Sequence, residues 1–169
     1  MAIPSFNKDL GPCHVYWNDE YVGPTNGGVK VKIEGKFADI KEDGQGVIAV
    51  DAVFTGYDVA EIDVPLTRST LDILETLIHG SDLDGDVLSI FNQVGDNMYP
   101  LAKELELRPA INNVASVTTT EYMSFPKTYP VIANEPAYDL SNQRVWKTKF
   151  KVFPKAESPD IGVLAYYGD

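Results

Sequence analysis

The chain has 169 residues, of which 25 are acidic and 14 basic, so its formal net charge is -11. This length suits a single domain with a substantial core, and 44% hydrophobic residues exclude an intrinsically disordered chain. The acidic excess disfavours tight nucleic-acid binding, although it permits DNA to slide past. No apolar run approaches the roughly 20 residues of a membrane span, and a lone cysteine excludes an intrachain disulfide. We expect a soluble protein, without a membrane partner, made in a reducing cytoplasm.

Residues 1–28 are predicted to form an N-terminal arm and a short hairpin, and residues 29–169 a single β-sandwich domain. Glycines and prolines are dense in the first segment and prevent long regular elements. Within it, residues 14–17 and 21–22 favour strands, and Asn18, Asp19 and Glu20 supply a polar turn. We expect the N-terminal arm, about residues 1–12, to become ordered only against a neighbouring subunit.

Alternating apolar and polar residues predict the next strands. Residues 29–34 alternate strictly, and residues 37–40 continue the pattern. Residues 47–54 are apolar on both faces, which predicts a central strand that ends at Thr55 and Gly56. Residues 59–66 alternate again, with Glu61 and Asp63 on an exposed acidic face and Pro65 at the end of the strand.

One amphipathic helix is predicted over about residues 70–79, with its leucines on one stripe. Ser69 and Asp72 resemble a capping box, and Gly80 suits a left-handed stop. Residues 82–95 look like a loop that has room for a short helical turn. Further strands are predicted over residues 111–120, 144–153 and 161–167. The fold class is therefore mainly β (β-dominated α+β), an antiparallel β-sandwich or barrel with one amphipathic helix packed on it.

The clearest late strand alternates an apolar face with a basic face formed by Lys147, Lys149 and Lys151. These lysines could touch phosphate groups, protect a solvated strand edge, or meet Glu61 and Asp63 of a neighbouring copy. We expect the two carboxylates and the lysine row to lie at a lumen or at a subunit interface.

The run from Asp82 through Asp84 to Asp86 places carboxylates at alternate positions, an arrangement that could chelate calcium. It fails the EF-hand pattern, because the required glycine position holds Val87 and the glutamate position holds Gln93. We therefore favour an ordinary acidic loop over a metal site.

Catalytic signatures are missing from the sequence. Cys13 and His14 are adjacent on a predicted strand, so their side chains point to opposite faces, and His79 is more simply a partner for the helix end. No nucleophile elbow, phosphate loop, dinucleotide fingerprint or zinc spacing occurs. We predict no enzyme activity and no cofactor.

The stretch from Gly11 to Val31 combines a short hairpin with a Gly-Gly-Val strand start, and the further predicted elements follow in order over roughly the first 80 residues. This pattern resembles tail tube-like virion proteins of tailed bacteriophages. The resemblance implies a β-sandwich protomer that assembles into hexameric rings, which stack into a tube through which DNA passes without specific binding. Sheath, neck or baseplate proteins would be further partners, and the virion tail its location. A neck or tail-completion protein and a carbohydrate-binding β-sandwich module are the alternatives.

Overall fold

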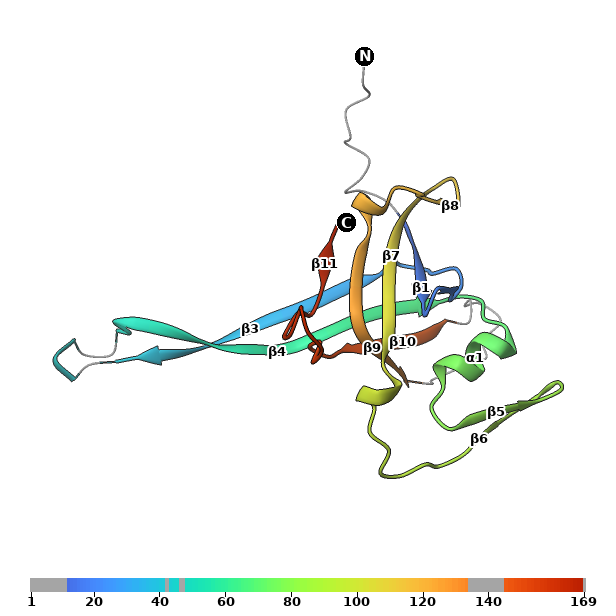
Figure 1. The fold of residues 1–169 in the computed structure, drawn as a ribbon, viewed down its shortest axis with the longest axis horizontal. Helices are drawn as coiled ribbons and strands as arrows, with labels where there is room; N and C mark the ends of the chain where they lie inside the picture. Colours follow the sequence, from blue (N-terminus) through green and yellow to red (C-terminus); the bar gives the residue numbers. More distant parts are fainter. Residues whose placement is uncertain (1–11, 42, 46–47, 134–144, 169) are drawn as a thin grey trace, which may run out of the picture.

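The computed structural model describes residues 12–41, 43–45, 48–133 and 145–168, and strands dominate them (Figure 1). The strands are β1 Cys13–Trp17, β2 Glu20–Tyr21, β3 Lys30–Ile40, β4 Asp51–Leu66, β5 Ser81–Asp84, β6 Val87–Ile90, β7 Lys103–Ile111, β8 Val114–Ala115, β9 Met123–Ala133, β10 Trp146–Val152 and β11 Tyr166–Tyr167. The single α-helix of this described part is α1 Leu71–Leu77, and short 3-10 turns are η1 Asp43–Gln45, η2 Tyr99–Leu101 and η3 Thr119–Glu121. The predicted mainly β class with one helix is confirmed.

The main sheet has the order β2-β1-β7-β9-β10-β4-β3, and all its pairings are antiparallel. It does not close into a barrel. Strand β9 contains one extra residue against β7, because Leu105 aligns with Phe125 while Lys103 aligns with Thr128. Such a bulge bends a strand, so β9 carries the sheet from one layer to the other.

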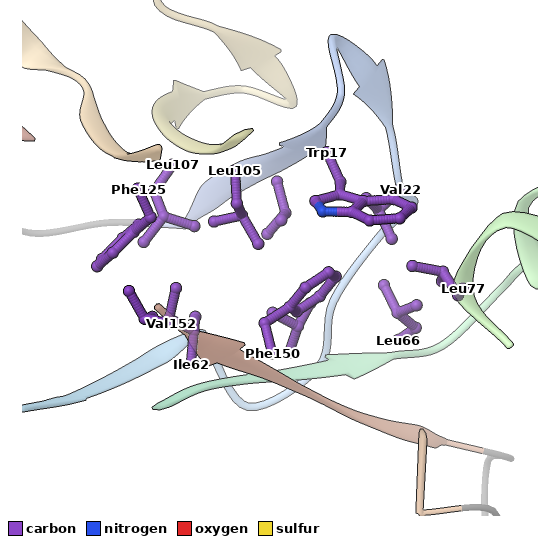
Figure 2. Packing of buried hydrophobic residues seen from close by; sticks show 12 residues of the cluster. Trp17, Val22, Ile62, Leu66, Leu77, Leu105, Leu107, Phe125, Phe150 and Val152 are labelled. Carbon is purple, nitrogen blue, oxygen red and sulfur yellow. The ribbon is translucent and has the colours of Figure 1, made fainter. Parts of the chain in front are cut away.

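The core lies between the two layers of this folded sheet (Figure 2). The side chains of Trp17, Leu105, Leu107 and Phe125 face those of Ile62, Leu66, Phe150 and Val152 across it. The ring centroid of Trp17 is 6.1 Å from that of Phe150, and both residues are buried. The predicted inward faces of residues 59–66 and 146–152 are therefore confirmed.

Helix α1 forms where the sequence predicts it, although it is shorter. Leu74 and Leu77 are buried, whereas Leu71, the first residue of the predicted stripe, is largely exposed. The N-cap is Thr70 and not Ser69: the Thr70 backbone is extended, and its hydroxyl oxygen accepts a hydrogen bond from the amide of Ile73 at 3.4 Å.

The early hairpin also forms as predicted, with Asn18 and Asp19 at positive φ in its turn. The predicted strand break at Thr55 and Gly56 is wrong, because β4 continues through both residues. Gly56 has a φ of 124°, a conformation open to glycine, and it lies beside a register irregularity between β3 and β4. The irregularity is absorbed within the strand, so the strand does not end there.

Several other expectations are corrected. Residues 47–54 are not a central strand: residues 51–54 belong to an exposed hairpin, and Val47 lies outside the described residues. Residues 82–95 are not a loop throughout, because β5 and β6 pair as a hairpin. Residues 111–120 contain only the end of β7, the short β8 and the start of η3, and residues 161–167 contain only β11. Residues 1–11, which make up nearly all of the predicted N-terminal arm, lie outside the described residues, and so does Arg144.

Candidate assembly surfaces

A long hairpin of β3 and β4 projects from the body of the fold, and we call its outer part, residues 34–40 and 51–59, the arm (Figure 1). Strand β10 pairs with β4 only from Glu61 to Leu66. Within the described residues, the arm therefore consists of two strands that have only each other as partners. A two-stranded ribbon has little independent stability in water, so contact with a further partner would stabilise the arm.

The arm carries large apolar side chains in solvent. Phe37 is 62% exposed, Tyr57 58% and Phe54 47%. The Phe54 ring packs edge-on between the other two, with centroid distances of 5.3 Å to Phe37 and 5.2 Å to Tyr57. A β-carbon at Gly35 would lie 2.9 Å from the Phe54 ring, so this glycine lets the ring lie close over the backbone. A contiguous exposed apolar cluster of this kind marks an interaction surface.

Strand β3 is also the last strand of the main sheet. In the part of the chain that the structure describes, no strand pairs with the outer edge of the 11-residue strand Lys30–Ile40, which makes this edge a template for a strand from another chain. Its flanking ion pairs are exposed, Lys32 with Glu34 at 3.3 Å and Lys36 with Asp58 at 4.0 Å. Pairs of this kind contribute little to stability and would not oppose docking.

The predicted acidic and basic residues meet on one face of the sheet within a single chain. The ammonium group of Lys149 lies 2.9 Å from a carboxylate oxygen of Glu61 and 3.8 Å from one of Asp63. The hydrogen bond to Glu61, together with both negative charges, raises the pKa of Lys149 above its ordinary value. On the opposite side of β4, Lys30 aligns with Asp63 and Lys32 with Glu61. The two carboxylates are thus flanked by lysines and do not form an acidic wall.

A groove of about 440 Å³ has Asp63 and Lys149 among its lining residues. Its charged lining residues are three lysines, Lys30, Lys147 and Lys149, and one acidic residue, Asp63. The backbone of Gly27 and Gly28 forms part of its rim, and the remaining lining residues are Asn26, Val64, Pro65 and Thr148. We call this the basic groove. Its positive surplus is notable in a chain of net charge -11.

A second hollow, of about 650 Å³, lies over β7 and is lined by Glu104, Glu106 and Arg108 among others. The Arg108 guanidinium stacks 4.0 Å from the ring centroid of Tyr16 and donates hydrogen bonds to Glu106. Partial burial and the charge of Glu106 raise the pKa of Glu104. Arg108 is satisfied on both sides, which is typical of a structural group.

The candidate calcium residues Asp82, Asp84 and Asp86 lie on the β5–β6 hairpin, which we call the acidic finger. All three are exposed. In the part of the chain that the structure describes, no three histidine, cysteine or carboxylate side chains are grouped closely enough to hold a metal ion. The finger is fixed at its base, because Glu75 of α1 accepts a hydrogen bond from the amide of Leu83 at 3.0 Å.

The remaining candidates have structural partners. Burial raises the pKa of the Cys13 thiol, which disfavours the reactive thiolate, and the neighbouring His14 packs its ring on Tyr21. His79 contacts the Tyr129 hydroxyl at 2.7 Å and the Asp96 carboxylate at 3.2 Å. None of the helices in the described ranges is both long and apolar enough to cross a bilayer.

No family model and no curated protein matches this sequence. Among solved structures, the chain is similar to the sheath/tube terminator of the PVC extracellular contractile injection system in its extended state. The TM-score is 0.51, and the match covers 89% of this chain and 92% of the terminator at 12% identity. This chain shares the fold of a sheath/tube terminator. The likeness spans most of both chains, and at this identity it concerns the fold alone.

Proposed function

We propose that this chain is a structural subunit of a phage tail or a tail-like particle and that it assembles with copies of itself into a ring through the arm. The observation that carries the proposal is the cluster of Phe37, Phe54 and Tyr57, exposed on a two-stranded ribbon that projects from the core. Among the described residues of the chain, nothing buries this cluster, whereas a neighbouring copy can.

The shared fold supports a place at the end of a tube, as a terminator or neck component, alongside the tail-tube role that the sequence resemblance implies. A ring of six copies and the passage of DNA through it are further parts of the proposal. A net charge of -11 supports such a conduit, because like charges keep DNA from adhering. The role is non-enzymatic, which accords with the protonated state favoured for the Cys13 thiol.

The test compares two double variants that remove the same residue types. Phe37→Ala/Tyr57→Ala removes two aromatic side chains from the arm. Phe91→Ala/Tyr167→Ala removes a phenylalanine and a tyrosine elsewhere on the surface, which are 55% and 74% exposed. Sedimentation over a concentration series and negative-stain electron microscopy would follow assembly.

We expect rings or short tubes from the wild type and from the control variant. The arm variant should need at least about tenfold more protein to reach half assembly, because aromatic residues dominate the binding energy of interfaces. Circular dichroism should show that both variants are folded. A wild-type protein that stays monomeric at high concentration, or an arm variant that assembles like the control, would refute the proposal.

A further inference from the structure

The basic groove and the acidic finger have opposite charge and lie on different parts of the chain. The groove is lined by residues of 26–30, 63–65 and 147–149, and none of its lining residues comes from the finger, residues 81–90. In Figure 1, the arm projects to the left, and the β5–β6 hairpin lies on the right and points away from the body of the fold. Each feature is therefore open to a second molecule.

We propose that the acidic finger of one copy inserts into the basic groove of the next copy around the ring. This inference rests on the proposed function and names a specific contact within it. Because the two surfaces differ, the contact is head-to-tail, and repetition of a head-to-tail contact closes into a ring when the rotation allows it.

The groove has unsatisfied positive charge to offer. Lys149 is neutralised by Glu61 and Asp63, but neither Lys30 nor Lys147 forms an ion pair or a side-chain hydrogen bond with any described residue. Two of the three lysines that line the groove thus have no paired counter-charge among the described residues. A carboxylate placed between them would gain attraction from both, and partial enclosure in the groove would strengthen that attraction relative to open water.

The finger offers the matching groups. Asp84 and Asp86 flank Gly85 at its turn, and Val87 follows with an exposed side chain. Carboxylates with an apolar neighbour fit a groove whose lining residues include three lysines, with their apolar stems, and Pro65. A β-carbon added at Gly27 or Gly28 would meet no atom within 4 Å, so the rim leaves room for a backbone to approach.

The finger is held in place before it binds. The Ser81 hydroxyl lies 2.7 Å from the carbonyl oxygens of both Glu75 and Ile78 and shares its one proton between them, and the amide of Phe91 donates to the carbonyl of Gly80 at 2.8 Å. These bonds tie the start of β5 to the end of α1, and they tie the residue after β6 to the glycine that precedes β5. A finger with a fixed base loses less conformational entropy on docking than a free loop would.

Nucleic acid is a less suitable occupant. A phosphate backbone needs a continuous basic track, whereas the groove is a short hollow that also contains Asp63. The acidic remainder of the protein would repel DNA from its surroundings.

A charge exchange between the finger and the groove tests the contact. The variants are Lys147→Glu in the groove, Asp84→Lys in the finger, and the two combined. Lys103→Glu is the matched control: it makes the same change in charge at an exposed site on β7, outside the groove. Each variant would be followed by sedimentation at several salt concentrations, with circular dichroism to establish that it is folded.

Each single charge reversal should raise the concentration for half assembly by about tenfold at low salt, and the combined variant should return to within about threefold of the wild type. Lys103→Glu should behave like the wild type, and added salt should reduce the differences. Single variants that assemble like Lys103→Glu, or a combined variant no better than the worse single variant, would overturn the inference.

The outcomes separate this inference from the proposed function. If the wild type assembles and loses assembly in Phe37→Ala/Tyr57→Ala, but the charge exchange has no effect, only the finger contact is refuted. A wild type that never assembles refutes both. Fluorescence anisotropy with a labelled DNA duplex provides a further check: loss of DNA binding in Lys147→Glu with unchanged assembly would overturn the contact and assign the groove to phosphate.

Discussion

Replacing Phe150 by alanine tests whether the two layers of the sheet depend on one another. The Phe150 side chain has 0% exposure and faces Trp17 across the core (Figure 2). Its strand is paired on both sides, since Phe150 aligns with Ile62 of β4 and with Pro130 of β9. Because hydrogen bonds hold β10 on both sides, it cannot shift to fill the space that the ring leaves. Most of the cavity should therefore persist.

The size of the effect follows from this geometry. A buried phenylalanine replaced by alanine costs about 3–5 kcal/mol of unfolding free energy, and a cavity that cannot collapse lies in the upper part of that range. We expect a loss of about 4 kcal/mol. For a domain of this length, each kcal/mol lowers the Tm by about 2–4 °C, so the expected fall is about 8–16 °C.

The assay is urea unfolding followed by circular dichroism, at a protein concentration below that of assembly so that subunit contacts do not contribute. Phe37→Ala is the control, since it removes the same side chain from the exposed arm and should change the unfolding free energy by no more than about 0.5 kcal/mol. A loss of less than about 1.5 kcal/mol in Phe150→Ala, or equal losses in both variants, would show that the layers do not pack around this ring.

Other predictions concern single groups. Gly80→Ala should lower the unfolding free energy by about 2 kcal/mol in urea melts, because φ is +72° and the new β-carbon would lie 2.6 Å from the carbonyl oxygen of Phe91. Burial raises the pKa of Cys13, so at pH 8 its thiol should react with a maleimide more slowly than free cysteine does; an equal rate before and after unfolding in urea would contradict this. Partial burial and the charge of Glu106 raise the pKa of Glu104, so its contribution to stability is present at low pH and lost as pH rises through the folded-state pKa. Glu104→Gln should therefore raise the Tm at pH 7 but not below the ordinary pKa of 4.5, and a gain that is independent of pH would count against this assignment.

The sequence by itself determines the elements that are buried on one side. In residues 59–66 and 146–152, apolar side chains alternate with charged ones, and this period can be satisfied only by a strand with one face in the core. The β1–β2 hairpin and the helix after Thr70 are also determined by nearby residues. The turn residues of the hairpin, and the leucines of the helix, lie within a few positions of one another.

Two central strands were missed for different reasons. Strand β7 has a readable alternation, with Leu105 and Leu107 inward, and could have been predicted from it. Strand β9 could not, because Pro126 and Pro130 break the usual pattern of a central strand. Pro130 is tolerated because it lies beyond Thr128, the partner of the first residue of β7, Lys103; at Pro130, β10 alone pairs with β9 in the described structure.

Only the tertiary structure decides what the surfaces are. The apolar run that includes Phe54 indicates burial, yet it lies on the exposed arm, because sequence hydrophobicity does not distinguish a core from a contact surface. Glu61 and Lys149 are 88 positions apart, and their pairing depends on the neighbouring placement of β4 and β10 in the sheet. The carboxylates of the finger look like a metal loop in sequence, but strand pairing spreads them along an exposed hairpin. Local periodicity reports which face of an element is apolar, whereas the order of strands in the sheet determines which faces and charges meet.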